Sequence, residues 1–153
     1  MPNTSICGIF SIEKYINMRK IFIIADNANI LYGLQAKLNV EGHSTFLSSN
    51  DSIENVLRQI NLVLPEIIIL NLELASINGF KLVSEIKSKE ELSNLSIFIY
   101  SDLSDPINLN YCENLGLEYC FDRQNILLDD FIIRMGRILQ NNEKLKDIYE
   151  VKN

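Results

Sequence analysis

The stretch PEIIILN, residues 65–71, decides the fold class of this chain. Its continuous run of isoleucine and leucine is typical of a parallel strand that is covered on both faces, and the run ends at the polar residue Asn71. An earlier apolar run, residues 21–24, ends in Ala25 and Asp26. Two buried strands that stop next to short polar side chains predict neighbouring strands that open onto one pocket.

Strand and helix patterns alternate on both sides of this stretch. The spacing of apolar residues predicts strands near residues 20–25, 44–48, 66–70, 97–100 and 117–121. It predicts helices near residues 28–41, from Ser52, after Gly79, from Ser104 to Gly116, and from Leu127 onward. Such strand–helix units predict an α/β fold with a doubly wound parallel sheet and right-handed crossovers. Ligands of these sheets bind at the carboxyl ends of the strands. The residues predicted at that edge are Ala25, Asp26, Asn71, Ser101, Asp102, Asp122 and Arg123.

Composition limits the class of protein. The 153 residues, 47% of them apolar, are enough for one packed domain, and the longest apolar stretches are too short for a transmembrane helix. The net charge of −6 disfavours binding to DNA or RNA, because phosphate contacts need clustered lysine and arginine. Three cysteines without a Cys-x-x-Cys pair indicate a reducing compartment. We therefore expect a cytoplasmic protein that binds neither nucleic acid nor membrane.

The expected folded unit is residues 18–140. Residues 1–17 lack the basic start of a signal peptide and are interpreted as an N-terminal extension. Residues 141–153 are mostly polar and are interpreted as the end of a helix and a C-terminal tail.

Four segments, in order, carry a resemblance to a known family. They are IFIIADNANILYGL from Ile21, PEIIILNLELASINGF from Pro65, IFIYSD from Ile97 and LGLEYCFDR from Leu115. With these segments the chain resembles, over residues 19–140, the receiver domain of bacterial response regulators, the CheY-like superfamily. The resemblance implies a flavodoxin-like fold with five parallel strands in the order 2-1-3-4-5. It also implies a role in two-component, or phosphorelay, signal transduction.

The resemblance fails at the phosphorylation site. In that family an acidic pair closes the first strand and holds Mg²⁺, and an aspartate closing the third strand accepts the phosphoryl group. Here Ala25 and Asp26 stand at the acidic pair, and Asn71 stands at the phospho-acceptor position. A carboxamide cannot attack phosphorus, so we expect a pseudo-receiver that is not phosphorylated there. Asn71 is then either an inert relic or a lock on one conformation.

Three further positions match the family only in part. Ser101 stands at the hydroxyl position that closes the fourth strand, and Arg123 stands where lysine is usual. Cys120 falls at the aromatic switch position of the fifth strand, where we interpret it as a small core residue. Ser101 is expected to hydrogen-bond Asn71 in a polar cluster, with a remnant switch role as the alternative.

The charge of the pocket argues against a metal. One carboxylate, Asp26, stands against one cation, Arg123, so the pocket is close to neutral without a metal. Mg²⁺ prefers an octahedral oxygen shell with one or two carboxylates and several waters. Asp26 is therefore only a weak candidate ligand, even if Glu73 adds a carboxylate. We expect an Asp26–Arg123 ion pair, solvated charges at Glu73 and Asp102, and neither a metal nor a cofactor.

Enzymatic activity is not expected. The first strand is not followed by a glycine-rich phosphate loop, and the single histidine, His43, lies in a predicted surface turn. Output by protein–protein interaction is expected instead, with a histidine kinase, another regulator or a homodimer mate as partner. The partner surface that the resemblance implies comprises Tyr111, Glu113, Asn114, Leu127 and Asp130.

Two alternatives stay open at this point. The first is a phosphorylation-controlled response regulator in which another acid, such as Asp26 or Asp102, accepts the phosphate. The second is a domain that is retained as a structural subunit outside signalling. Mg²⁺-dependent labelling by a small phosphodonor distinguishes the first alternative from a binding module.

Overall fold

The computed structural model describes residues 18–152, and describes side chains as far as residue 142. The predicted N-terminal extension, residues 1–17, lies outside the described residues. Five strands form one sheet: β1 (Lys20–Ile24), β2 (Ser44–Leu47), β3 (Ile67–Leu70), β4 (Ser96–Ser101) and β5 (Tyr119–Asp122). Every strand pairing is parallel, and the strand order is β2-β1-β3-β4-β5, which confirms the predicted fold class and topology.

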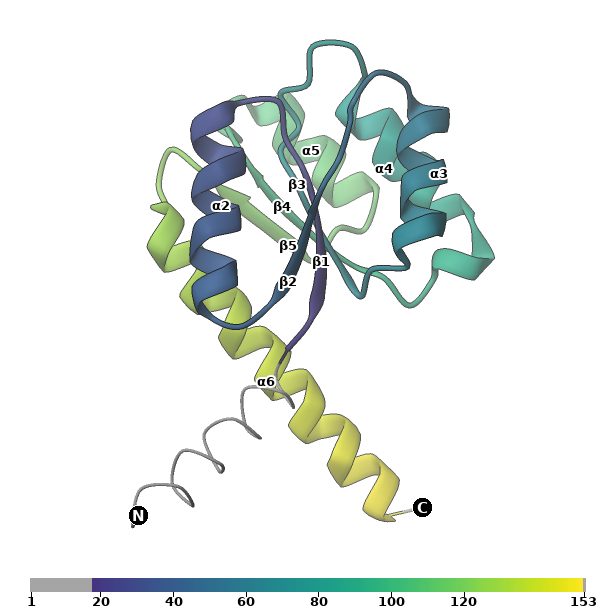
Figure 1. The fold of residues 1–153 in the computed structure, drawn as a ribbon, viewed down its shortest axis with the longest axis vertical. Coiled ribbons are helices and arrows are strands. Elements are labelled where there is room, and N and C mark those ends of the chain that lie inside the picture. The colour runs from purple at the N-terminus through teal and green to yellow at the C-terminus, as the bar shows by residue number, and fades with distance from the viewer. Residues whose placement is uncertain (1–17, 153) are drawn as a thin grey trace, which may run out of the picture.

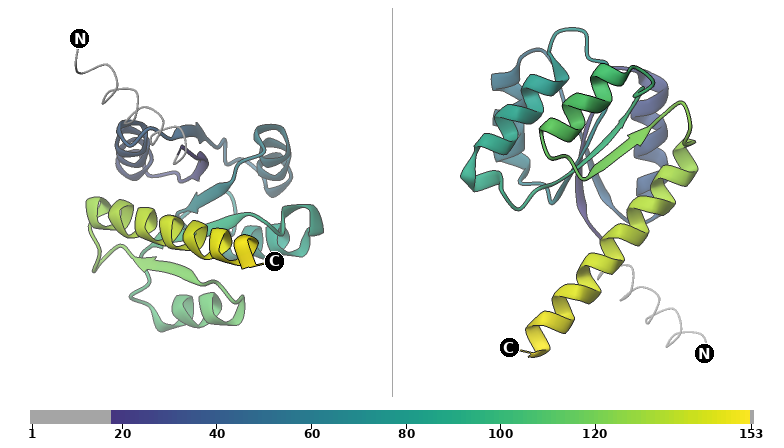
Figure 2. Two further views of the ribbon diagram at one scale, coloured as in Figure 1. Left: turned by 90° about the horizontal axis from the view of Figure 1, so that it is seen from below. Right: turned by 180° about the vertical axis from the view of Figure 1, so that it is seen from behind.

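Helices cover both faces of this sheet (Figure 1). The helices are α2 (Ala28–Val40), α3 (Ile53–Val63), α4 (Gly79–Ser88), α5 (Pro106–Asn114) and α6 (Leu128–Lys152), with a short 3₁₀ helix, η1 (Glu90–Leu92). Helices α2 and α6 pack on one face, and α3, α4 and α5 lie on the other (Figure 2). The last helix continues past the domain boundary predicted at residue 140 and extends beyond the amino edge of the sheet (Figure 1).

The two-sided burial of the strands explains the fold. All four residues of β3 are buried, as the uninterrupted apolar run predicts. Alternate residues of β1 pack against the helices on opposite faces of the sheet, because successive side chains of a strand point to opposite faces. Ile21 and Ile23 pack with α2 and α6, whereas Phe22 and Ile24 pack with α3 and α4.

Short polar residues fix where the helices begin. Asn27, Ser52, Asn78 and Asp105 are the N-caps of α2, α3, α4 and α5, and each side chain accepts a hydrogen bond from a backbone N–H in the first turn. Pro106 follows the cap of α5 at the first helical position, where its missing N–H costs nothing. Each cap ends a loop that follows a strand, so these loops line the carboxyl edge of the sheet.

Helix α5 is the helix held least firmly by the core. Among its nine residues only Cys112 is buried. Three of its apolar side chains are instead largely exposed: Ile107 at 61%, Leu109 at 45% and Tyr111 at 51%. Within the part of the chain that the structure describes, no helix is both long and apolar enough to cross a membrane.

Candidate functional site

The carboxyl edge of the sheet brings the predicted site residues together. The pairing of β1 with β3 places Ile24 beside Leu70, and the Asn71 N–H donates to the Ile24 carbonyl at 2.9 Å. The pairing of β4 with β5 places Ser101 beside Asp122, and the Arg123 N–H donates to the Ser101 carbonyl at 2.8 Å. The residues after β1, β3, β4 and β5 therefore face one shared region, as their positions at strand ends predicted.

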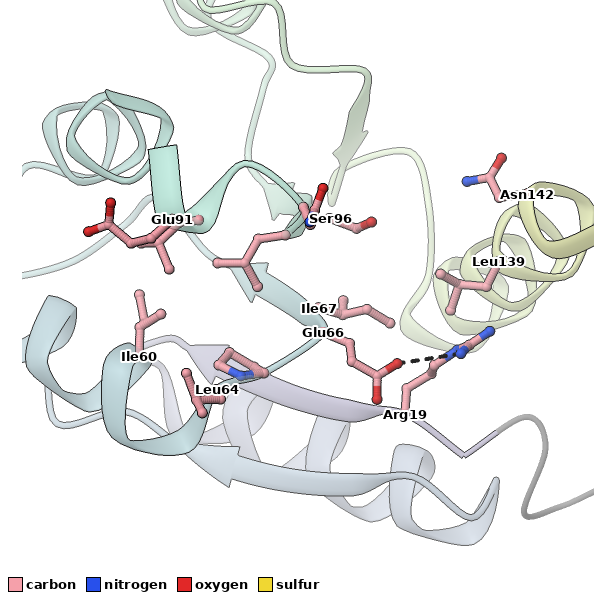
Figure 3. A pocket seen from close by; sticks show the side chains of 13 residues that line it. Arg19, Ile60, Leu64, Glu66, Ile67, Glu91, Ser96, Leu139 and Asn142 are labelled. Carbon is pink, nitrogen blue, oxygen red and sulfur yellow. Dashed lines mark hydrogen bonds and ion pairs between the residues drawn. The ribbon is translucent and has the colours of Figure 1, made fainter. Parts of the chain in front are cut away.

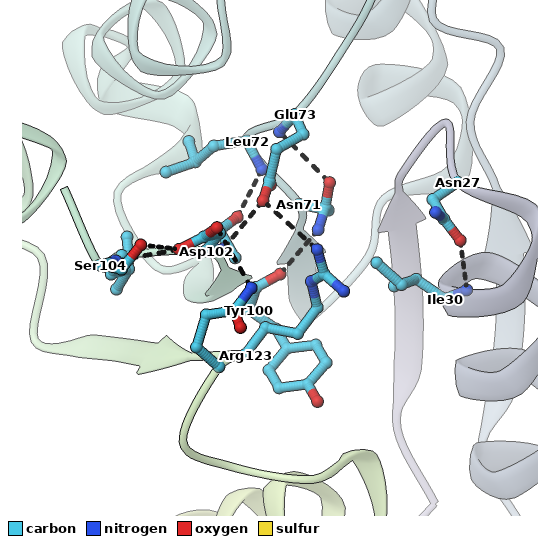
Figure 4. Close-up of polar contacts among 12 residues, drawn as sticks. Asn27, Ile30, Asn71, Leu72, Glu73, Tyr100, Asp102, Ser104 and Arg123 are labelled. Atoms are coloured by element: carbon cyan, nitrogen blue, oxygen red, sulfur yellow. Dashed lines mark hydrogen bonds and ion pairs between the residues drawn. The ribbon is translucent and has the colours of Figure 1, made fainter.

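Asn71 uses both ends of its carboxamide (Figure 4). The side chain is only 2% exposed. Its Nδ2 donates to the Tyr100 carbonyl of β4 at 3.0 Å, and its Oδ1 accepts the Glu73 N–H at 3.2 Å. An ionised aspartate has two acceptor oxygens and no donor, so it cannot make the first of these bonds. The carboxamide thus links β3 to β4 in a way that a carboxylate of the same shape cannot.

Ser101 makes a different contact from the one expected. It is fully buried, and its Oγ accepts the Leu72 N–H at 2.6 Å. The expected hydrogen bond between Ser101 and Asn71 is wrong, because the Asn71 amide is already engaged by Tyr100 and Glu73. Ser101 and Asn71 still act on the same segment, since both hold the backbone that leaves β3.

The predicted ion pair between Asp26 and Arg123 is also wrong. Asp26 Oδ1 accepts Asn50 Nδ2 at 2.9 Å, and Asp26 Oδ2 accepts the Ala75 N–H at 2.7 Å. Asn50 also donates to the Ala25 carbonyl at 3.3 Å. Sequence reasoning missed Asn50. The signal for it was its place in the loop after β2, at the same edge as the other site residues.

Arg123 pairs with Glu73 instead. Its Nη2 lies 3.9 Å from Glu73 Oε1, close enough for attraction but too far for a hydrogen bond. The same carboxylate oxygen accepts the Asp102 N–H at 2.8 Å (Figure 4). The Glu73 side chain is 44% exposed at the rim, and it also contacts the loop after β4 and Arg123.

Asp102 is likewise part of a network. Its Oδ1 accepts the Ser104 N–H at 3.0 Å and the Ser104 hydroxyl at 2.6 Å, and its Oδ2 accepts Gln124 Nε2 at 3.2 Å. The Ser104 hydrogen bonds lower the pKa of the Asp102 carboxyl from its ordinary value. Asp102 is therefore an exposed, ionised carboxylate at the rim that also organises the β4–α5 loop.

The loop after β5 is organised by Asp122. Its Oδ1 accepts the N–H groups of Leu103 and Gln124 at 3.1 and 3.0 Å, and its Oδ2 accepts Asn125 Nδ2 at 3.0 Å. The Tyr100 hydroxyl donates to the Ile126 carbonyl in the same loop at 2.7 Å. Burial raises the pKa of Tyr100, so this hydroxyl keeps its proton and remains a donor.

The residues present do not fit Mg²⁺. Both oxygens of Asp26 already accept hydrogen bonds, and Asn71 Oδ1 accepts the Glu73 N–H. In residues 18–142, no group of three histidine, cysteine, aspartate or glutamate side chains is arranged to hold a metal ion. A hard divalent cation needs several free oxygen ligands in octahedral order, and this edge does not offer them.

Cys120 lies in the strand interior as a partly buried side chain that packs against the α3–α4 layer. Its thiol is near the Leu117 carbonyl at 3.9 Å. The hydrogen bond with the Cys112 thiol, together with burial, raises the pKa of Cys120. A protonated thiol is a poor nucleophile, which fits the interpretation of Cys120 as a core residue.

The predicted partner surface is exposed. Leu127 is 74% exposed, and Glu113, Asn114 and Asp130 are exposed as well. Tyr111 stacks against Phe80 of α4, with ring centroids 4.9 Å apart. Sequence reasoning missed two neighbours on α5, Ile107 and Leu109. Their signal was apolar residues in a helix whose hydrophobic positions do not form one inward-facing stripe.

A pocket of about 460 Å³ lies at the opposite edge of the sheet (Figure 3). Leu64, Glu91 and Leu139 are among its lining residues, and Arg19 pairs with Glu66 across 3.4 Å at its side. None of the site residues predicted from the sequence lines it, so it is separate from the edge that carries Asn71.

Several known structures of receiver domains have the same architecture as this chain. The chemotaxis response regulator CheY4 of Vibrio cholerae superposes with a TM-score of 0.68 at 13% identity, over 79% of this chain and 98% of that one. The signal receiver domain of a DNA-binding response regulator from Colwellia psychrerythraea gives a TM-score of 0.67 at 18% identity, over 82% and 98%. The receiver domain of a signal transduction histidine kinase from Syntrophus aciditrophicus gives 0.70 at 19% identity, over 81% and 91%.

The fold is that of a response regulator receiver domain. The descriptions of these neighbours name a chemotaxis response regulator and the signal receiver domains of a DNA-binding response regulator and of a signal transduction histidine kinase. No model of a known protein family matches the chain, and no curated protein matches it either. At these identities the likeness establishes the fold, and the activity has to be argued from the site.

Proposed function

We propose that this chain is a pseudo-receiver of two-component signalling that acts through protein–protein interaction without being phosphorylated. The observation that carries the proposal is the double use of the Asn71 carboxamide. At the position where the receiver family has its acceptor aspartate, this chain has a buried donor and acceptor that joins β3 to β4. The group is not a nucleophile, and its contacts suit an amide rather than an acid.

The rest of the pocket supports this proposal. Asp26 is engaged by Asn50 and Ala75, so it does not replace the missing acidic pair. Arg123 is attracted to Glu73, a group of the chain itself. The charged groups at this edge interact with other groups of the chain, so the edge offers little net charge to attract a divalent cation or a phosphoryl group. We accordingly propose no enzymatic activity and no resident cofactor.

The proposed partner is a protein of the same signalling class. A histidine kinase or another response regulator fits the receiver fold, and a second copy of this chain is the remaining candidate. Support comes from α5, which presents Ile107, Leu109 and Tyr111 to solvent while burying a single residue. Ile107 and Tyr111 are four residues apart and share one face of α5, whereas Leu109 lies on another face of the helix. Contiguous exposed apolar groups such as this pair mark interaction surfaces more often than isolated ones do. The proposed place of action is the cytoplasm.

The first test is the intact mass of the protein after incubation with acetyl phosphate and Mg²⁺. We expect the natural chain to gain no phosphoryl group, and Mg²⁺ alone to leave its Tm unchanged, because a ligand that does not bind does not stabilise. Addition of a phosphoryl group to the natural chain would overturn the proposal. Stabilisation by Mg²⁺ that disappears in Asp26→Ala would show a metal site and count against it as well.

A second candidate is phosphorylation of another acid, and one observation favours Asp102. Its hydrogen bonds with Ser104 keep the carboxylate ionised at the rim of the pocket. Mapping of any modified residue in the same mass experiment distinguishes the candidates. A phosphoryl group on Asp102 would establish a phosphorylation-controlled regulator with an unusual acceptor.

The partner surface is tested by photo-cross-linking in living cells. A photoreactive residue in place of Tyr111 is expected to form an adduct with a histidine kinase, a response regulator or a second copy of this chain. The matched control replaces Leu62 of α3, which is 77% exposed on a different helix. Equal cross-linking from both positions, or from Leu62 alone, would place the contact elsewhere.

A further inference from the structure

The Glu73 carboxylate holds an unusual position for an exposed acid. It reaches from the loop after β3 to the loop after β4, where its Oε1 accepts the Asp102 N–H at 2.8 Å. On its other side lies Arg123, which follows β5, with Nη2 at 3.9 Å. One anionic group is therefore shared by the ends of three neighbouring strands (Figure 4).

We propose that Glu73 is a built-in anion that fixes the β4–α5 loop and thereby sets the position of α5. The inference rests on the proposed function, because it explains how a chain without phosphorylation presents one constant docking surface. Glu73 is a positioning residue in this account: it acts on α5 through the loop and does not itself touch the partner.

The direction of the Glu73 side chain is set by Asn71. Its Oδ1 accepts the Glu73 N–H at 3.2 Å, which turns the chain immediately after β3. Ser101 holds the intervening residue through the Leu72 N–H at 2.6 Å. Both anchors are buried, so the backbone that carries Glu73 leaves the core in a defined direction.

The loop that Glu73 binds leads directly into α5. Asp102 bonds the backbone and hydroxyl of Ser104, and Asp105 is the N-cap of α5 through the Ile107 N–H at 2.9 Å. Because only Cys112 of α5 is buried, the core alone gives this helix little restraint. The loop therefore contributes to the position of the helix, together with the stacking of Tyr111 on Phe80. Glu73 is one of the groups that hold this loop, and Asp122 is another, through the Leu103 N–H.

Charge is essential to this role. The Asp102 N–H and the Arg123 guanidinium both favour a negative group between them, and a bond to an ionised acceptor is stronger than one between neutral groups. Arg123 Nε is buried and has no hydrogen-bond partner within the described residues, so the attraction of the guanidinium to Glu73 is electrostatic, through Nη2. Loss of the Glu73 charge removes the carboxylate that is paired with the guanidinium.

The experiment is hydrogen exchange, read by mass spectrometry, on the full chain with Glu73→Gln and Glu73→Ala. We expect amides of residues 102–114 to exchange about fivefold faster in Glu73→Ala, as weakening by roughly 1 kcal/mol implies. Glu73→Gln is expected to lie between this variant and the natural chain, since the amide oxygen keeps the hydrogen bond and loses the charge. The matched control is Glu118→Gln, an exposed acid with no polar contact among residues 18–142, and it is expected to change nothing in this segment.

Chemical rescue separates an anion from a simple packing role. Sodium formate supplies a free carboxylate, so it is expected to restore protection in Glu73→Ala, whereas sodium chloride at equal ionic strength is not. Unchanged exchange in Glu73→Ala would overturn the proposal. Faster exchange without rescue by formate would overturn it too, and would leave Glu73 as an ordinary structural contact.

Failure here is distinguishable from failure of the proposed function. The exchange experiment contains neither phosphodonor nor partner, so its outcome does not alter the mass of the natural chain after acetyl phosphate. A chain that stays unphosphorylated with unchanged exchange in Glu73→Ala would keep the proposed function and lose only the role of Glu73.

Discussion

At the scale of single residues, the difference between asparagine and aspartate lies in one donor group. Asn71 and an aspartate would fill the same space between β3 and β4. Only the amide gives the Tyr100 carbonyl a hydrogen while accepting one from the Glu73 N–H. The contacts at this position therefore suit an amide better than a carboxylate. Whether the amide also acts as a lock is tested by the following substitution.

Asn71→Asp is expected to destabilise the protein by about 1–3 kcal/mol at neutral pH, since a buried carbonyl loses its donor and faces a charge. The loss should shrink as the pH falls, because a protonated carboxyl can again donate a hydrogen. Urea denaturation measures the difference. The matched control is Asn78→Asp at the N-cap of α4, where both residues cap a helix equally well. Equal stability of Asn71→Asp and the natural chain would refute the lock.

His43 provides a pH-dependent prediction. Its Nδ1 accepts the Arg19 N–H at 3.0 Å, and the side chain is partly buried. Burial lowers the pKa of His43 from its ordinary 6.5, ahead of opposing effects from nearby charges. The folded state therefore binds this proton less readily than the unfolded chain does. Stability from this group is present above the ordinary pKa and is lost as the pH falls below it.

The measurement is the urea midpoint at pH 7.5 and pH 5.5, for the natural chain and for His43→Gln. The natural chain should lose stability over this interval, and the variant should lose less of it. A variant with the same pH dependence would mean that other groups cause the loss.

At the scale of elements, Gly79 shows why α4 begins where it does. A Cβ at this position would lie 2.9 Å from the Leu72 carbonyl oxygen and 3.0 Å from Leu72 Cα. The helix thus starts in direct contact with the backbone that leaves β3, which is the segment carrying the site.

Gly79→Ala is expected to cost about 1–3 kcal/mol, because backbone must shift to admit the methyl group. Gly136→Ala in α6 is the matched control: its Cβ would meet nothing within 4 Å, and alanine favours a helix interior by about 1 kcal/mol. Thermal denaturation should therefore move the two Tm values in opposite directions. A drop in both would show that the crowding at Gly79 is not the cause.

Most elements were predictable from the sequence because apolar spacing and caps act locally. The β3 run and the caps Ser52 and Asp105 gave the right element type in the right place. The boundaries differ by a few residues, as at β5, predicted near 117–121 and found at Tyr119–Asp122. Frayed strand ends are decided by hydrogen bonds to neighbouring strands, which a single segment does not reveal.

The pairings within the site were not predictable to the same degree. Position at a strand end correctly brought Asp26, Asn71 and Arg123 to one edge. Position at a strand end did not reveal that Asn50, from another loop, donates a hydrogen bond to Asp26. Nor did it reveal that Arg123 pairs with Glu73. The partner of a long side chain depends on its torsion angles and on which donors compete for the same acceptor. Both depend on the conformations of loops, which have no periodic sequence pattern.

At the scale of the whole molecule, the sheet separates two apolar layers. Ile21 of β1 packs with α2 and α6, whereas Ile60 of α3 packs on the other face. Residues without shared neighbours contribute to stability independently.

Ile21→Val and Ile60→Val are each expected to cost about 0.5–1.5 kcal/mol, and the double variant the sum, within roughly 0.5 kcal/mol. Urea denaturation of the three variants and the natural chain measures this. The comparison pair is Ile60→Val with Ile68→Val, both in the α3–α4 layer, where coupling is expected. Strong coupling between Ile21 and Ile60 would mean that strain passes through the sheet.

The two outer strands limit how copies of this chain can associate. Both β2 and β5 have only four residues, and within residues 18–152 each leaves one row of backbone groups without a neighbouring strand. Charged side chains flank β5, with Glu118 before it and Asp122 at its end. Short edges next to charge are poor templates for adding a foreign strand, so fibre-like growth by sheet extension is disfavoured. We therefore expect that the protein does not aggregate through its sheet edges at high concentration, and that its contacts with other proteins are made by the helices.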